Sequence, residues 1–216
     1  MTPHAAPALL RTLFAIATVL GALAAAPAGA APAPAPAASA PYALFGGKPL
    51  EWERSGGKVV GVYTPNWQPT ALVDALHGDS VTHVVYAFLH VCGPGQLAED
   101  APKCAGKSAF QLASSEIDDR FNDAFARLKA RAPHVKVVAS VGGWGGSDPL
   151  FHIADDAAPR AAFAKSAADF LRAHPAFDGI DIDWEHPTSN GSANGVPLGS
   201  PADGQGYADL MAALRA

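Results

Sequence analysis

The stretch 177–187 constrains the fold of this chain more than any other, because acidic and apolar residues alternate along it. Side chains of a β-strand alternate between its two faces, so a strand here would direct Asp181, Asp183 and Glu185 to one face. The other face would carry two isoleucines and a tryptophan. The sequence therefore predicts a column of three carboxyl groups on a strand that is buried on both sides, as strands of parallel sheets are.

Three neighbouring carboxyl groups do not favour folding by themselves. Unpaired charges resist leaving water, and like charges at this spacing hinder one another's ionisation. We therefore expect an acid/base site in which the aspartates share a proton and Glu185, at the end of the strand, protonates a leaving group. The alternative is an acidic edge strand that faces solvent, which the apolar residues between the acids disfavour.

Apolar, strand-like runs alternate with amphipathic, helical runs through most of the chain, which is typical of βαβ units and a parallel sheet. We expect strands at 58–63, 83–90, 136–144 and 177–187, and helices at about 71–77, 115–128, 163–171 and 207–214. The helix at 115 begins at a capping box, Ser115 to Asp118. The sequence therefore predicts an α/β fold built from four βα units.

Two motifs resemble those of glycoside hydrolase family 18, the chitinases. Residues 178–185 have the form D-x-x-D-x-D-x-E, and residues 140–143 have the form S-x-G-G one βα unit earlier. The resemblance covers residues 58–216 and implies a (β/α)8 TIM barrel of which about the first four βα units are present. Because such a barrel takes about 250 residues, we expect a fragment or a truncated gene product, with a compact four-unit domain as the alternative.

The resemblance also implies roles for individual residues in a retaining, substrate-assisted reaction. Glu185 would act first as acid and then as base, Asp183 would orient the N-acetyl group of the sugar, and Asp181 would hold Asp183. Supporting positions are Asp178, Ser140, Gly142 and Gly143, and the expected platforms for sugar rings are Trp144, Tyr63 and Trp67. Core packing is the alternative role for Tyr63 and Trp67.

The function that the resemblance implies is hydrolysis of β-1,4 bonds between N-acetylglucosamine units of chitin by a secreted enzyme. Chitin or N-acetylglucosamine oligosaccharides would be its partners, without a cofactor or metal. The alternatives are an endo-β-N-acetylglucosaminidase of the same family and a non-catalytic chitin-binding lectin, which the presence of Glu185 disfavours. Family residues expected on later strands are not among these 216 residues, so we expect this chain alone to be weakly active or inactive.

The first 30 residues are typical of a secretory signal. Arg11 precedes an apolar run at 13–26, and small residues follow at 28–30. Residues 31–57 form a Pro/Ala-rich linker and lead-in. We therefore expect an extracellular or periplasmic protein, with an uncleaved membrane anchor as the alternative.

The cysteines and the charge balance give expectations about cross-links and partners. Cys92 and Cys104 are the two cysteines, and in an exported protein we expect them to form a disulfide rather than two free thiols. The eight histidines show no spacing typical of metal ligands. Without residues 1–30 the chain holds 14 basic and 20 acidic side chains, an unclustered balance that disfavours nucleic acid. We expect a monomer that has no membrane partner after signal cleavage.

Overall fold

The computed structural model describes residues 56–216, together with the backbone of two short strands before them. These strands, β1 (Ala43–Leu44) and β2 (Lys48–Pro49), pair antiparallel. The expected signal segment at 1–30 lies outside the described residues, as does most of the expected linker at 31–57. Within the described part of the chain, no helix has the length and apolar character needed to cross a membrane.

A parallel sheet of four strands, in the order β3-β4-β5-β6, forms the centre of residues 56–216. Its strands are β3 (Gly61–Pro65), β4 (His83–Leu89), β5 (Lys136–Gly142) and β6 (Gly179–Asp183). The helices are α1 (Ala71–Ala75), α2 (Ala101–Cys104), α3 (Glu116–Arg131), α4 (Asp148–Asp155), α5 (Ala157–Ala173) and α6 (Asp203–Arg215), with 3-10 helices η1 (Gly78–Ser80) and η2 (Ala98–Asp100). Strand order follows chain order, as in the first half of a (β/α)8 barrel, so the predicted fold is confirmed.

The helix α4 is the longest element that the sequence pattern did not predict, and the short elements α2, η1, η2, β1 and β2 were not predicted either. Six of its eight residues are buried, Asp148 and Pro149 among them. A helix that is buried on most sides shows no apolar stripe with a polar face opposite it, so the usual helical periodicity is absent. The other predicted elements are present, with boundaries shifted by a few residues.

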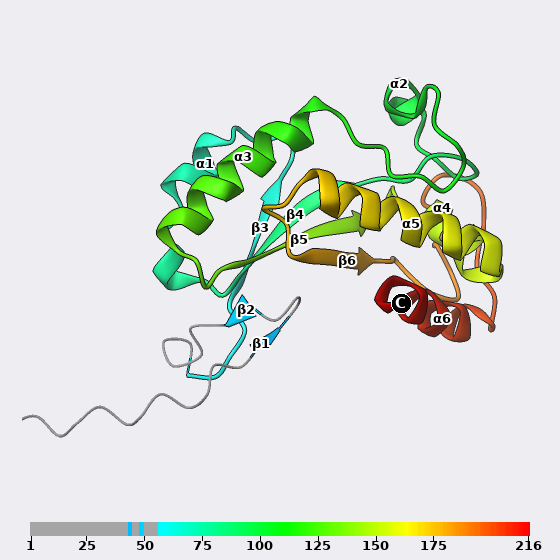
Figure 1. Ribbon diagram of the computed structural model, residues 1–216. Coiled ribbons are helices and arrows are strands. Elements are labelled where there is room, and N and C mark those ends of the chain that lie inside the picture. The colour runs from blue at the N-terminus through cyan, green and yellow to red at the C-terminus, as the bar shows by residue number, and fades with distance from the viewer. Residues whose placement is uncertain (1–42, 45–47, 50–55) are drawn as a thin grey trace, which may run out of the picture. The chain divides into compact units, whose positions relative to one another are not determined.

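One face of the sheet packs against α3 and α5, which lie along it (Figure 1). The side chain of Tyr86 in β4 is fully buried there, with its ring centroid 4.9 Å from that of Phe121 and 5.9 Å from that of Phe125. Its hydroxyl donates to Asp118 Oδ1 at 2.5 Å. Asp118 also accepts from the Ser115 N–H at 2.6 Å, which confirms the predicted capping box and joins the start of α3 to the core.

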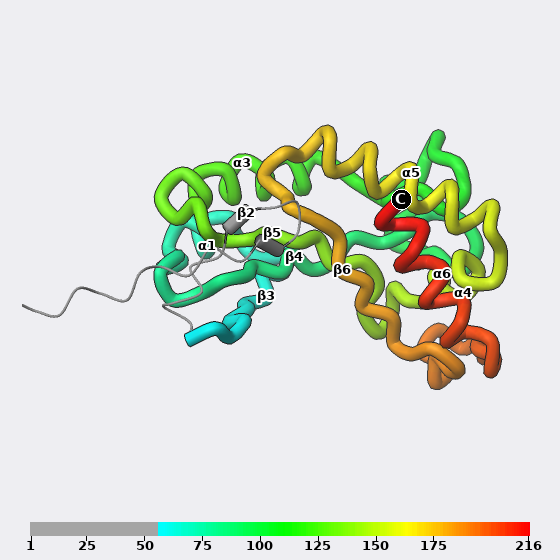
Figure 2. Tube along the Cα trace, turned by 60° about the horizontal axis from the view of Figure 1, so that its bottom comes forward, coloured from blue at the N-terminus to red at the C-terminus, as the bar shows by residue number. Residues whose placement is uncertain are grey.

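The helices α4, α5 and α6 pack on one another near the C-terminal end of β6 (Figures 1 and 2). Trp184, which follows β6, is buried between them. Its ring lies 4.9 Å from that of Phe151 in α4, edge to face, and 6.1 Å from that of Tyr207 in α6. A buried aromatic side chain of this size contributes a few kcal/mol of stability, on the order of 2–3, so Trp184 anchors the end of the acidic strand.

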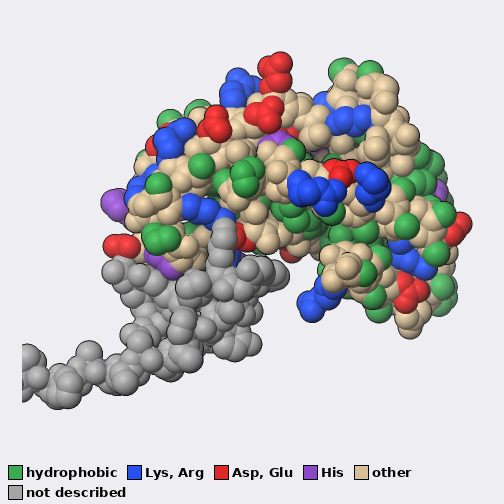
Figure 3. All heavy atoms as spheres, viewed as in Figure 1, with side chains coloured by type: hydrophobic (Ala, Val, Ile, Leu, Met, Phe, Trp, Pro, Cys, Tyr) green, Lys and Arg blue, Asp and Glu red, His purple; other side chains and the backbone are tan. Residues whose placement is uncertain are grey.

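Charges of both signs lie among one another on the face of the molecule seen in Figure 3. On α5, for example, Asp169 forms ion pairs with both Lys165 and Arg172. All three side chains are largely exposed, and such pairs add little to stability. Their effect is to neutralise charge locally on this face.

Candidate active site

The three acids of the predicted column lie in one row on the face of the sheet opposite α3 and α5. Asp181, Asp183 and Glu185 are half-buried, whereas Ile182 and Trp184 between them are buried on the other face. The predicted alternation is therefore confirmed. The prediction that the strand is buried on both faces is wrong, because the acidic face is partly accessible to solvent.

The strand itself is shorter than the sequence predicted. It ends at Asp183, and Glu185 lies in a bend beyond it. The last paired residues of the two strands are Gly142 and Asp183, because the backbone of β5 turns away through positive φ angles at Gly142 and Gly143 (+116° and +80°). Glu185 thus lies in the same row as the two aspartates, although its backbone is not paired in the sheet.

The S-x-G-G motif lies directly beside the acids. Ser140 is fully buried in β5 and its hydroxyl donates to Asp181 Oδ2 at 2.6 Å. A Cβ atom at Gly142 would lie 2.3 Å from the carbonyl oxygen of Asp183, and one at Gly143 would lie 3.1 Å from the Phe88 ring. Close approach of backbone and a positive φ both favour glycine at position 142, whereas at position 143 the main reason is the positive φ.

The acids perturb one another and a nearby tyrosine. Burial raises the pKa of Asp183 above its ordinary value, and the carboxylates of Glu185 and Asp181 raise it further, with His186 opposing them. Burial also raises the pKa of Tyr63 in β3, and the same carboxylates add to this shift. Tyr63 therefore shares the electrostatic environment of the column.

The aromatic residues expected at the strand ends are exposed. Trp144, Tyr63 and Trp67 have exposed fractions of 52%, 56% and 67%, which excludes core packing for each. Trp144 follows β5, and its ring centroid lies 6.1 Å from that of His186. Of the three, Trp144 and Tyr63 lie near the acidic row, Trp144 beside His186 and Tyr63 within electrostatic reach of the carboxylates.

Asp178 lies at the opposite end of β6 from this mouth. Its side chain is 1% exposed, forms an ion pair with Lys129 of α3, and accepts from the Val137 N–H at 2.8 Å. The structure does not bring Asp178 together with the other acids. Its contacts are those expected of a residue that fixes the start of the strand.

Sequence reasoning missed a second group of polar residues behind Trp144. Asp148, 4% exposed, accepts from Asn190 Nδ2 at 2.9 Å and from Asn194 Nδ2 at 3.0 Å. Asn194 Nδ2 also lies 2.9 Å from the Gly145 carbonyl oxygen. These bonds fasten the loop after β6 to the loop after β5, and no sequence periodicity could have identified partners more than 40 positions apart.

The predicted disulfide is present. Cys92 and Cys104 are joined with an S–S distance of 2.05 Å and close the segment after β4. Within that segment the buried carboxylate of Asp100 lies 2.6 Å from His90 Nδ1 and 2.7 Å from Lys103 Nζ. The cross-link and these polar contacts of Asp100 together hold η2 and α2 against the end of β4.

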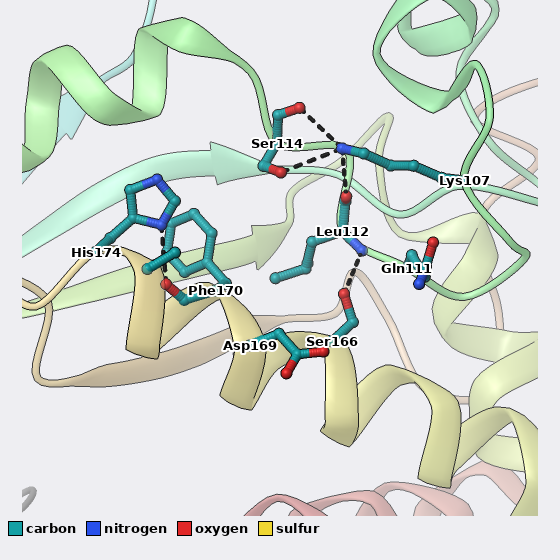
Figure 4. Close-up of a pocket in the computed structure, with 9 residues that line it drawn as sticks. Lys107, Gln111, Leu112, Ser114, Ser166, Asp169, Phe170 and His174 are labelled. Carbon is teal, nitrogen blue, oxygen red and sulfur yellow. Dashed lines mark hydrogen bonds between the residues drawn. The ribbon is translucent and has the colours of Figure 1, made fainter.

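A pocket of about 260 Å³ lies between α5 and the segment before α3 (Figure 4). Lys107 Nζ donates there to the carbonyl oxygens of Leu112 and Ser114 at 3.0 and 2.8 Å, and Ser166 Oγ accepts from the Leu112 N–H at 2.9 Å. The polar groups that line it thus bind one another and fasten this segment to α5. None of the acids of the column lines this pocket.

Among residues 56–216, no group of three or more His, Cys, Asp or Glu side chains is arranged to hold a metal ion.

Comparison with known proteins shows the family of the chain. The model of the glycosyl hydrolases family 18 matches residues 59–216. Chitinase A of Pseudoalteromonas piscicida is 31% identical over 190 residues, covering 74% of this chain and 23% of that protein.

Solved structures give the same result. The chitinase domain of the spore coat protein CotE from Clostridium difficile superposes with a TM-score of 0.55 at 27% identity, covering 73% of this chain and 38% of that one. Catalytic domain 2 of a group II chitinase from Ostrinia furnacalis, solved in complex with penta-N-acetylchitooctaose, gives 0.54 at 25% identity, covering 73% and 39%. The chain thus spans less than half the length of each relative. With a family match over residues 59–216, the chain belongs to the glycosyl hydrolases family 18.

Proposed function

We propose that this chain is part of a secreted chitinase that hydrolyses β-1,4 bonds between N-acetylglucosamine units. The observation that carries the proposal is the row formed by Asp181, Asp183 and Glu185 at the C-terminal end of a parallel sheet. Active sites of (β/α)8 barrels lie at this end. The family membership and the oligosaccharide bound by the Ostrinia furnacalis relative support chitin as the substrate class.

Glu185 is the proton donor in this proposal. Its side chain is 30% exposed, so the carboxyl group can contact a bound sugar. It protonates the leaving glycosidic oxygen while the acetamido oxygen of the substrate attacks the anomeric carbon and forms an oxazolinium ion. Glu185 then removes a proton from water, which opens this intermediate with retention of configuration.

Asp183 and Asp181 hold the acetamido group in place and stabilise its developing charge. The raised pKa of Asp183, caused by burial and by its two acidic neighbours, supports a proton shared between the aspartates. Ser140 contributes by donating to Asp181 Oδ2, which keeps that carboxylate beside Asp183. Exposed rings on which sugars can stack are those of Trp144, Tyr63 and Trp67. Trp144 directly follows the S-x-G-G motif at 140–143.

The catalytic assignment is tested with Glu185→Gln, which keeps the shape of the side chain and removes its proton. Cleavage of N-acetylchitooligosaccharides by the full-length gene product is measured by mass spectrometry, and the first anomer formed is identified by NMR. We expect the variant to lose about 100-fold or more in kcat, as for loss of a general acid. Glu116→Gln, the same change at an exposed position at the start of α3, should retain the wild-type rate.

Three results would overturn the proposal. Full turnover by Glu185→Gln would remove the proton donor. Binding of the oligosaccharide by the wild-type protein without any cleavage would indicate a lectin. Release of glycans from a high-mannose glycoprotein, with no product from chitin, would indicate a different substrate class.

Secretion is part of the same proposal and rests on the composition of residues 1–30. We expect the protein in the culture medium or periplasm to begin after the small residues at 28–30. Sequencing of its N-terminus checks this, and an intact residue 1 on membrane-bound protein would contradict it.

A further inference from the structure

Ser147 is a fully buried serine between the ends of β5 and β6. Its hydroxyl oxygen accepts from the N–H of Glu185 at 3.0 Å. The same oxygen lies 2.7 Å from the carbonyl oxygen of Gly143 and 3.2 Å from that of Asp183, so its hydrogen is directed to these acceptors. The Ser147 hydroxyl therefore binds backbone groups at the C-terminal ends of both β5 and β6.

The place of Ser147 in the chain makes these contacts unexpected. It precedes the first residue of α4, where a serine side chain commonly accepts from an N–H of the first helical turn. Ser147 makes no such side-chain capping bond. Its hydroxyl is turned away from the helix that it begins and toward the backbone of the acidic column.

Glu185 depends on such a contact because it lies outside the sheet. The strand ends at Asp183, so pairing with β5 fixes Asp183 but not the residues that follow. The Gly143 N–H donates to the carbonyl oxygen of Asp183 at 2.8 Å, and the Ser147 hydroxyl extends this connection by two residues to the N–H of Glu185. The separation between the two acids is thus set by the loop after β5.

We propose that Ser147 is a positioning residue that holds Glu185 in its place relative to Asp183. The inference rests on the proposed function for its effect on catalysis, whereas its effect on the backbone can be measured without turnover. Proton transfer depends steeply on geometry, and a displacement of about 1 Å can lower a rate by about 100-fold. Loss of the Ser147 hydroxyl is therefore expected to lower kcat and to leave substrate affinity nearly unchanged.

The test compares Ser147→Ala with Ser166→Ala in the full-length gene product. Ser166 is a matched control because its hydroxyl also accepts a backbone N–H, that of Leu112, at the pocket of Figure 4. We expect Ser147→Ala to lower kcat for N-acetylchitooligosaccharides by about 10-fold to 100-fold with KM nearly unchanged. Hydrogen exchange of the Glu185 amide, followed by NMR, should be about tenfold faster. Ser166→Ala should change neither quantity.

A second variant separates the hydroxyl from the packing of the site. Ser147→Thr keeps the hydroxyl and should restore Glu185 amide exchange to within about threefold of wild type. Exchange as fast in Ser147→Thr as in Ser147→Ala, or wild-type kcat and exchange in Ser147→Ala, would overturn the inference. If the wild-type protein does not cleave the substrate, the proposed function fails, and exchange at Glu185 still decides the role of Ser147.

Discussion

Gly142→Ala is the substitution whose effect the structure defines most sharply. Its added Cβ would lie 2.3 Å from the carbonyl oxygen of Asp183 and 3.1 Å from its carbonyl carbon. Both atoms belong to the backbone of the neighbouring strand, so no side chain can rotate to relieve the contact. Reaching even the shortest tolerated separation, 3.0 Å, requires the strands to move apart by about 0.7 Å at the acidic column.

The loss of stability has three sources. A non-glycine residue at φ +116° costs about 1–3 kcal/mol in backbone strain. Overpacking of a close contact costs about 1–3 kcal/mol. Lengthening of the hydrogen bond from the Gly143 N–H to the Asp183 carbonyl oxygen costs about 1 kcal/mol. We therefore expect the free energy of unfolding to fall by about 3–7 kcal/mol.

Two other glycines separate these sources. Gly106 has φ +79° with no atom within 4 Å of its added Cβ, so Gly106→Ala should show the strain alone, about 1–3 kcal/mol. Gly145 has neither a positive φ nor a contact shorter than 3.8 Å, so Gly145→Ala should change stability by less than about 1 kcal/mol. Urea unfolding of the three variants, followed by fluorescence, measures the series. A loss in Gly142→Ala no larger than that in Gly106→Ala would refute the close contact between β5 and β6.

Two further predictions concern the cross-link and the acids. Replacing Cys92 and Cys104 by alanine opens a link with a sequence separation of 12, for which loop-closure entropy gives about 3 kcal/mol. A loss below about 1 kcal/mol in urea unfolding would contradict this estimate of the disulfide's contribution. Burial and two acidic neighbours raise the pKa of Asp183 in the folded protein. Between the pKa of the unfolded chain and this raised pKa, the folded protein keeps a proton that the unfolded chain releases. The free energy of unfolding therefore falls as pH rises between these two pKa values. Asp183→Asn should therefore raise the urea midpoint at about pH 7 and leave it unchanged at about pH 3, and an equal rise at both pH values would argue against this linkage.

The face of the acidic column could be predicted from sequence because the pattern that sets it is local. The buried side chains of Ile182 in β6 and of Trp184 just after it fix the alternation, and a shift of one residue would bury the acids instead. The capping box at Ser115 and the order of the βα units are likewise encoded over a few neighbouring residues. The exposed position of Trp144 follows from its place after the end of β5, whereas Tyr63 is exposed in the middle of β3.

The contacts that hold Glu185 could not be predicted in this way. Ser147 is 38 positions from Glu185, and Asp148 is 42 positions from Asn190. Which side chains meet across such distances depends on the register of β5 against β6, and spacing within either segment carries no information about it. The end of the strand at Asp183 was missed for the same reason, because it depends on where β5 turns away.

The two motifs of this chain therefore encode different things. The acidic motif places carboxyl groups through the alternation of a single strand, and its geometry follows from its own sequence. The S-x-G-G motif instead lets one backbone approach another. Gly142 leaves room for the carbonyl oxygen of Asp183, which accepts from the Gly143 N–H, and the positive φ angles of both glycines then turn the chain out of the sheet. Because this turn also brings Ser147 to the N–H of Glu185, the distance between the two acids is set by residues that carry no charge. A change in that loop should move the proton donor while every carboxyl group is retained.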